Sequence, residues 1–343
     1  MFLKNLTRLS LAVAIASGTM VSCSDDDTDG NQSANSTFVY ASNNSNGNIT
    51  VYDVSNSASV SSSSFITASL AADGIYADGN GTVFQASRTD NGLEGFSIST
   101  DLVSGTAVNV SLDGPNDMSS PREVAVNGNL FVVADNADVD GDTNTPDGRL
   151  FIYSMSNGEF TLRNTVTTNF KVWGITFNGN DLYAVVDATN ELALFANFLA
   201  TNTADATVTA TKRIAIEGIV RTHGLTYDVA SDVMVMTDIG QASNGQDDGG
   251  FHIIENFTSK FNSVMPGGTL SVAQQTRVSG AATLMGNPVD VAYDSATQNI
   301  FIAEAGNGGG RILGFSNTDA GGNITPFFNS SLASASSVFL SKQ

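Results

Sequence analysis

The chain has 343 residues, with 34 acidic and 14 basic side chains, so its formal net charge is −20. Such a charge repels nucleic-acid phosphate, and no cluster of Lys and Arg with interleaved aromatic residues offsets it, which argues against nucleic-acid binding. Abundant Asn, Thr, Ser and Gly with little Lys or Arg suit an extracytoplasmic β protein, and no helical period is sustained over three turns.

The first residues are typical of a lipoprotein signal peptide. Lys4 and Arg8 precede an apolar stretch at 9–15, which is too short to span a bilayer permanently. Cys23 is the only cysteine, so no intramolecular disulfide can form, and its place after small residues suits diacylglyceryl attachment. We therefore predict a signal peptide over 1–22 with lipidation at Cys23, and a cleaved secretory peptide with an incidental cysteine is the alternative.

An acidic, polar segment follows the cysteine. Residues 24–29 read Ser-Asp-Asp-Asp-Thr-Asp. This run resembles the acidic export tag of some Gram-negative surface lipoproteins, which implies lipid anchoring on the outer face of the outer membrane; a merely solvated tether is the alternative. Asn, Ser, Gln and Gly continue to Ser36, so 23–36 is predicted to be a flexible linker and 37–343 a single folded domain.

From residue 37 onward the chain repeats one unit. Each unit holds a short apolar strand, a polar turn, a second apolar strand ending in an acid or amide, and a third strand. A repeat of roughly fifty residues built in this way is typical of β-propeller blades. The first strands of the units are predicted to begin near Gly74, Arg122, Val172, His223 and Val289.

The two ends of the domain supply a sixth unit. Residues 37–42 match a second strand that no first strand precedes, and residues 337–340 match a first strand that nothing follows. Pairing them would remove two exposed sheet edges. We therefore predict an all-β fold, a six-bladed β-propeller closed by its N- and C-terminal strands. Residues 257–286 lengthen the fourth interval and leave seven blades as the alternative.

The last complete unit resembles a known repeat. Residues 288–294 read Pro-Val-Asp-Val-Ala-Tyr-Asp and residues 299–304 read Asn-Ile-Phe-Ile-Ala-Glu. This pattern is similar to the unit of the NHL and YVTN-type propeller families. The resemblance implies the fold and leaves the chemistry open, because those families include enzymes, scaffolds and ligand binders.

In a propeller, the start of the inner strand and the end of the second strand lie on one face, so residues there are expected to meet at the mouth of the central channel. The predicted ligand-binding residues are Arg122, Trp173, Asp187, Asp238 and Glu304, with Asp135 beside them, and the candidate catalytic residues are His223, Glu123 and Asp290. Asp135, Asp187 and Asp238 are expected at equivalent positions in successive blades. The alternative is structural: each acid binds the following loop, and Trp173 packs between blades.

A second candidate is the insert at 136–147. Its oxygen-bearing side chains alternate around a central glycine, which resembles an EF-hand-type calcium loop. The predicted calcium ligands are Asn136, Asp138, Asp140, Asp142 and Asp147. An Asn in place of the first Asp, an Asp in place of the final Glu and flanking strands depart from that pattern. A solvated acidic loop is the alternative.

No serine-hydrolase elbow, zinc-protease motif or Walker loop is present, and no nucleotide or flavin is indicated. The leading prediction is a non-enzymatic surface lipoprotein that binds a protein or glycan partner on its propeller face. The alternative is a calcium-dependent lactonase or esterase, which resembles the six-bladed gluconolactonase and paraoxonase groups, with Glu123, His223, Asp238, Asp290 and Glu304 around a channel metal. A quinone-dependent dehydrogenase is a weaker third hypothesis, since only Arg122 offers positive charge to the cofactor.

Overall fold

The computed structural model describes residues 36–99 and 102–343. The predictions for the signal peptide, for Cys23 and for the tether up to residue 35 lie outside these residues. Within the described ranges, no helix is long and apolar enough to span a membrane.

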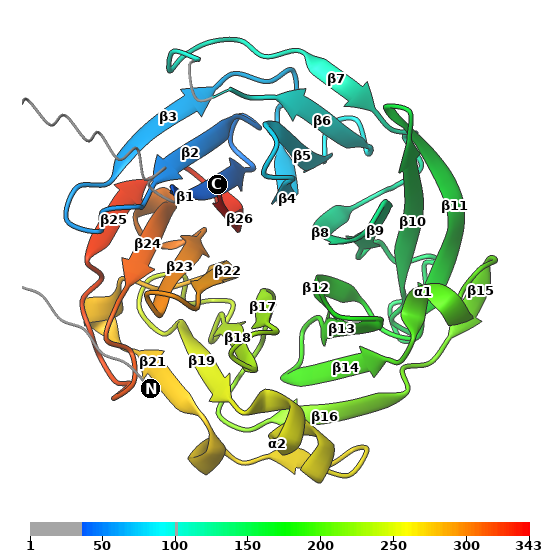
Figure 1. Cartoon of the computed structure of the whole chain (residues 1–343). Helices are drawn as coiled ribbons and strands as arrows, with labels where there is room; N and C mark the ends of the chain where they lie inside the picture. Colours follow the sequence, from blue (N-terminus) through cyan, green and yellow to red (C-terminus); the bar gives the residue numbers. More distant parts are fainter. Residues whose placement is uncertain (1–35, 100–101) are drawn as a thin grey trace, which may run out of the picture. The chain divides into compact units, whose positions relative to one another are not determined.

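Six sheets stand in a ring around a central channel (Figure 1). We number them as blades 1 to 6, and in each the inner strand is the one nearest the channel. Blade 1 contains β26 (Ala335–Lys342), β1 (Thr37–Asn43), β2 (Ile49–Asp53) and β3 (Ser61–Phe65). Blade 2 contains β4 (Ala72–Ala77), β5 (Thr82–Ser87), β6 (Leu93–Ser97) and β7 (Val110–Asp113). Blade 3 contains β8 (Pro121–Asn127), β9 (Leu130–Asp135), β10 (Gly148–Ser156), β11 (Glu159–Thr168) and β15 (Ala206–Val208).

The other three blades follow the same order from the channel outward. Blade 4 contains β12 (Val172–Asn178), β13 (Asp181–Val186), β14 (Glu191–Phe195), β16 (Lys212–Ile216) and β20 (Thr269–Leu270). Blade 5 contains β17 (Leu225–Asp228), β18 (Val233–Asp238), β19 (Gly250–Glu255) and β21 (Thr276–Ser279). Blade 6 contains β22 (Pro288–Asp294), β23 (Asn299–Glu304), β24 (Arg311–Phe315) and β25 (Phe328–Ser331). The short helices are α1 (Phe198–Thr201), α2 (Phe257–Ser263), η1 (Val272–Gln274), η2 (Ala281–Thr283) and η3 (Asn307–Gly309).

The two ends of the domain close the ring, which confirms the predicted six-bladed fold. Strand β26 pairs antiparallel with β1, from Thr37 opposite Lys342 to Asn43 opposite Ala335. Beyond that ladder, the backbone N–H groups of Ser36 and Gln343 each donate to the other residue's carbonyl at 2.9 Å. The inner strand of blade 1 therefore comes from one end of the chain and its second strand from the other.

The alternative of seven blades is wrong. Residues 257–286 form no sheet of their own, because β20 joins blade 4 parallel to β16 and β21 completes blade 5 beside β19. The rest of the insert consists of short helices and their connecting loops, and the helix α2 buries Phe257 and Phe261. These two residues are four apart, so they lie on one helix face, and both pack in the core between blades 4 and 5.

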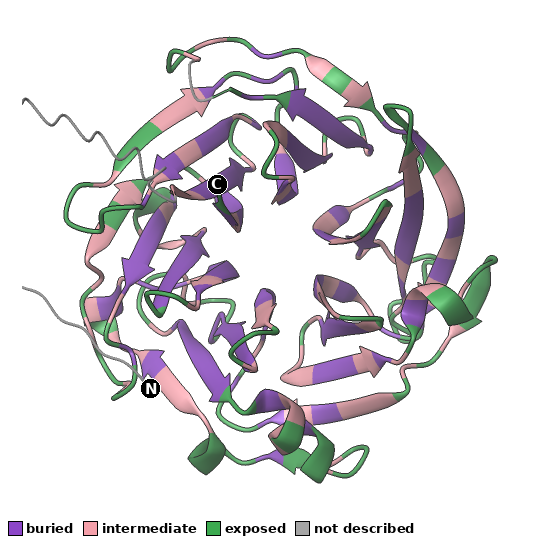
Figure 2. Cartoon of the chain, viewed as in Figure 1, coloured by how far each residue is buried: buried purple, intermediate pink, exposed green. Residues whose placement is uncertain are grey.

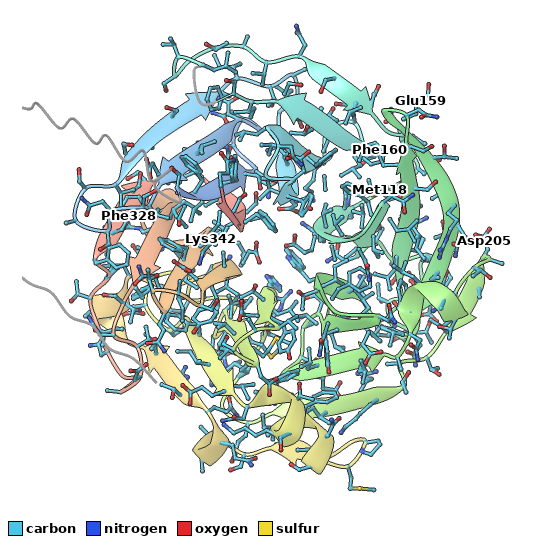
Figure 3. The ribbon with its side chains drawn as sticks, viewed as in Figure 1. Met118, Glu159, Phe160, Asp205, Phe328 and Lys342 are labelled. Atoms are coloured by element: carbon cyan, nitrogen blue, oxygen red, sulfur yellow. The ribbon has the colours of Figure 1, made fainter. Side chains whose placement is uncertain are left out.

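The core lies between neighbouring blades. Side chains alternate along each strand and therefore pack against the blade on either side. Figure 2 shows that the inner and second strands are largely buried, whereas the outermost strands are mixed. Between blades 2 and 3, Phe131 lies 4.9 Å from Phe84 and 5.1 Å from Phe160 (ring centroids), and Met118 packs with them (Figure 3). Each such side chain contributes about 1.5–3 kcal/mol on burial.

Glycines allow the inner strands to approach closely near one end of the channel. A Cβ atom on Gly174 would lie 2.4 Å from the carbonyl oxygen of His223, and one on Gly224 would lie 2.4 Å from Cα of Asp290. Such distances leave no room for a side chain. In strands β8 and β22 the corresponding positions hold Glu123 and Asp290, so these two acids sit where blades 2, 4 and 5 have a glycine.

Candidate ligand site at the channel mouth

Three of the predicted residues form a stack at the mouth of the channel. Arg122 on β8, Trp173 on β12 and His223 just before β17 occupy equivalent positions in blades 3, 4 and 5. The guanidinium carbon of Arg122 lies 4.0 Å from the Trp173 ring centroid, and the His223 ring lies 3.7 Å from it at an angle of 3°. Two groups so close to one centroid must lie on opposite faces. Both faces of Trp173 are therefore covered, and neither is open to stack against a sugar.

Charged groups extend the stack at both ends. Asp73, at the equivalent position of β4, accepts from Arg122 at 2.9 Å and lies 3.5 Å from Arg88. At the other end, Asp187 Oδ1 is 3.2 Å from Nε2 of His223 and 2.8 Å from the Arg221 guanidinium. A line of charged groups, with the Trp173 and His223 rings in its middle, thus crosses the mouth from blade 2 to blade 5. Asp73 and His223 are buried and the other members are partly buried, which strengthens these interactions relative to those at a free surface.

The protonation states at the mouth follow from burial and from these partners. Burial lowers the pKa of His223, and this effect outweighs the opposing influence of Asp187. Burial by itself would raise the pKa of Asp187, but hydrogen bonds and charges from His223 and Arg221 hold that pKa well below its usual range. At neutral pH we therefore expect an ionised Asp187 beside a neutral His223. A proton on Nε2, the nitrogen facing Asp187, leaves Nδ1 as a hydrogen-bond acceptor.

Three consecutive residues at the mouth carry buried polar atoms that have no partner among the described residues. They are Nε of Arg221, Oγ1 of Thr222 and Nδ1 of His223, while Nε2 of His223 has only its contact with Asp187. Thr222 is fully buried and His223 is 5% exposed. Buried polar atoms in folded proteins are nearly always hydrogen bonded, so this group indicates a place where a ligand atom or water completes the bonding.

The expectation that Asp187 is equivalent to Asp135 and Asp238 is wrong. Asp135 ends its strand opposite Pro121, whereas in blade 4 the corresponding place, opposite Val172, is taken by Val186. Asp187 follows one residue later, at the level of Asn136 in blade 3. This shift places its carboxylate beside Arg221 and His223, and Asn136 donates to it at 3.3 Å.

The acids that are in register bind their own loops, as in the structural alternative. The backbone N–H donors to Asp135 are Ser119, Ser120 and Ala137; those to Asp238 are Val220, Arg221 and Gly240; those to Glu304 are Gly286, Asn287, Gly306 and Asn307. All three carboxylates are fully buried. The structure therefore gives Asp238 and Glu304, both predicted ligand residues, a role in holding the loops at the mouth.

The other two candidate acids border the channel. Glu123 and Asp290 line a cavity of about 220 Å³ that is surrounded by all six inner strands. Asp290 Oδ2 accepts from the Ser337 hydroxyl at 2.7 Å and from the Val338 N–H at 2.8 Å, and Glu123 accepts from the Val124 N–H at 2.9 Å. Burial raises the pKa of Asp290 to about 7. Burial and the charge of Asp290 raise the pKa of Glu123 well above its usual range.

Asp290→Asn should change how stability depends on pH. The folded pKa of about 7 lies above the usual 3.8, so the stability from protonated Asp290 is full below pH 4 and lost as the pH rises through 7. Relative to the wild type, the free energy of unfolding of the variant should rise by roughly 1 kcal/mol per pH unit between pH 5 and 7. Urea unfolding of both proteins at pH 5 to 8 measures the difference in their free energies of unfolding. His223 and His252 have lowered pKa values and change stability in the opposite direction, but their contribution is the same in both proteins and cancels in the difference. A constant difference would contradict the prediction.

Each of the five predicted calcium ligands has its own hydrogen-bond partners within the protein. Asn136 binds Arg122 and Asp187 at the channel mouth, while Asp138, Asp140 and Asp142 each accept from a backbone N–H two or three residues further along. Asp147 accepts from the Val139 N–H. In this arrangement the five side chains do not converge on one point, so calcium binding here stays a prediction that requires the loop to rearrange.

The shell considered for a channel metal is also divided. Glu123 and Asp290 border the cavity and His223 faces Asp187, whereas Asp238 and Glu304 are held by backbone amides. Over residues 36–99 and 102–343, no three His, Cys, Asp or Glu side chains gather closely enough to hold a metal ion. The donor set considered for the lactonase hypothesis does not fit a single metal in this structure.

Several mouth residues were not predicted. Asp73, Arg88, Arg221 and Thr222 all take part in the charged line or its unpartnered atoms. Asp73 directly precedes Gly74, a predicted strand start, and aligning the six inner strands would have placed it level with Arg122. Arg221 and Thr222 precede the predicted strand start at His223 but lie in a loop. The sequence repeat predicts positions within strands and does not predict where loop residues lie.

Comparison with known proteins shows the architecture. No family model matches the chain, and no curated protein matches its sequence. Among solved structures, a chain of the nidogen/laminin complex is similar, with a TM-score of 0.57 and 12% identity over 89% of this chain and 98% of that one. A putative 6-phosphogluconolactonase from Bacteroides uniformis is similar as well, with a TM-score of 0.54 and 9% identity over 90% and 100%. At such low identity these similarities show the fold alone.

Proposed function

We propose that this protein is a cell-surface binding module that receives a polar group of a partner protein at the mouth of its channel. The unpartnered buried atoms of residues 221–223 carry this proposal. Nε of Arg221 donates a hydrogen bond, and Nδ1 of His223 accepts one when the imidazole is neutral. The hydroxyl of Thr222 can donate and accept. A side-chain amide of the partner, which has both donors and acceptors, matches this set.

A protein partner is favoured over a glycan. Both faces of Trp173 are covered, so the single tryptophan offers no platform for sugar stacking. The two long loops at 136–147 and 239–249 leave the second strands at the same end as the mouth and can frame a partner surface. A solved structure with this fold belongs to a nidogen/laminin complex, so a protein partner is compatible with the architecture.

A peptide library displayed on phage and selected on the mature domain tests the proposal. Thr222→Val keeps the volume of the side chain and removes its hydroxyl, so selected peptides should bind the variant about tenfold more weakly. Thr82→Val, at the opposite end of blade 2, is the matched control and should leave binding unchanged. Enriched peptides that bind Thr222→Val as tightly as the wild type, or no enrichment at all, would overturn the proposal.

The proposal includes anchoring through a lipid on Cys23. Cys23→Ser should move the protein from the membrane fraction to the soluble fraction, because a lipid anchor is then missing and the acidic domain has no attraction to anionic membrane. Fractionation followed by a high-salt wash measures this, with Ser24→Ala as the control that keeps the cysteine. A Cys23→Ser protein that stays with the washed membranes would refute the anchoring.

A further inference from the structure

The central channel holds a second candidate site, separate from the mouth. Its cavity of about 220 Å³ is lined by residues of all six inner strands, and none of the stacked mouth residues is among them. One water needs roughly 10–15 Å³, so the cavity has room for a small organic molecule. Part of its wall is aromatic, with Tyr76, Phe177, Tyr293 and Phe339 on four different strands and only partly buried.

The charged groups in this wall are all of one sign. Glu123 and Asp290 are its carboxyl groups, and no Lys or Arg lines the cavity. The nearest cation in sequence, Arg122, is held by Asp73 and stacked on Trp173. The two acids come from blades 3 and 6, on opposite sides of the ring, and the charge of Asp290 acts on Glu123. Asp290 is buried and Glu123 is partly buried, and two such carboxyl groups without a cation between them are unfavourable in their ionised state.

The cavity is more apolar at the end away from the mouth. Glu123 and Asp290 lie one residue below the mouth positions of β8 and β22, whereas Phe177, Tyr293 and Leu340 lie near the other ends of their strands and are only partly buried. An apolar entrance therefore leads toward an acidic end. This arrangement suits a molecule with an apolar body and a positively charged head.

We infer that the channel cavity binds a small primary amine, with its ammonium group between Glu123 and Asp290 and its apolar part along the channel wall. The ammonium supplies the missing positive charge and three hydrogen-bond donors. The apolar part gains free energy by leaving water. Since the acid pair holds a proton at mildly acidic pH, binding of the ammonium form ionises the pair and releases that proton to solvent. This site is independent of the function proposed for the mouth.

Calorimetry with n-butylamine, n-pentylamine and n-hexylamine tests the inference on the mature domain. Affinity should rise about fourfold with each added methylene. Hexanol and hexanoate should bind at least tenfold more weakly than hexylamine, because the first lacks the charge and the second carries the wrong one. Titration at pH 6 in two buffers with different ionisation enthalpies should show about one proton released for each amine bound.

Variants locate the amine. Asp290→Asn and Glu123→Gln should each weaken hexylamine binding at least tenfold and reduce the proton release, whereas Asp113→Asn, an exposed acid on β7, should change neither. Thr222→Val should also leave amine binding unchanged, which separates this site from the mouth. The inference would be overturned if hexylamine bound no better than hexanol, or if it bound both acid variants as tightly as the wild type. It would also be overturned if an equal concentration of sodium chloride produced the same heat signal as hexylamine.

Discussion

Deletion of residues 334–343 should abolish cooperative folding of the domain. The deletion removes β26, which pairs with β1 from Thr37 to Asn43, and leaves β1 and the channel side of blade 6 uncovered. At about 1 kcal/mol for each backbone hydrogen bond, with the burial of Val338 in addition, the loss approaches the whole stability of a typical domain. We expect aggregation or a broad, non-cooperative melting transition by calorimetry and circular dichroism.

A permuted chain provides the control for this deletion. Since Ser36 and Gln343 already bond to each other, residues 334–343 can be moved in front of Ser36 and joined to it by a two-residue Asn-Gly turn. This chain has the same composition apart from the turn and should melt cooperatively. A deletion variant that melts like the full domain would show that the ring does not depend on closure by the two ends.

Glu304→Ala should strongly destabilise the folded domain. The carboxylate is fully buried and accepts from four backbone N–H groups, those of Gly286, Asn287, Gly306 and Asn307. Its removal leaves these donors without an acceptor, and we expect a loss of about 3 kcal/mol or more in the free energy of unfolding. Glu304→Gln, which keeps one accepting oxygen, should lose about half as much.

Urea unfolding at pH 7 measures both variants, and Glu255→Ala is the matched control because that glutamate also ends a blade strand but is exposed. The control should change stability by less than about 0.5 kcal/mol. If Glu304 instead served only to bind a ligand, Glu304→Ala would unfold at the wild-type urea concentration. That result would return Glu304 to the set of ligand residues at the mouth.

The sequence repeat predicted where many of the site residues lie, but it did not predict what each side chain does. The starts at Arg122, Trp173 and His223 were predicted to meet at the mouth, and they do so as one stack. The predicted Asp238 and Glu304 are near the same rim, yet their carboxylates face the backbone of their loops. Sequence places a residue on a strand end, whereas the direction of its side chain depends on which amides the neighbouring loop presents.

The sequence by itself predicted a ring of six blades, with seven as the alternative, because strands and polar turns repeat along the chain. It also predicted closure of the ring, because each end of the domain has one strand without a partner. Only the tertiary structure decided that residues 257–286 add strands to two existing blades, since that depends on which sheet edges are free. It also decided that Asp187 leaves the register of the other acids and that Glu123 and Asp290 share one cavity. These features arise from contacts between blades, which a pattern read within each blade does not contain.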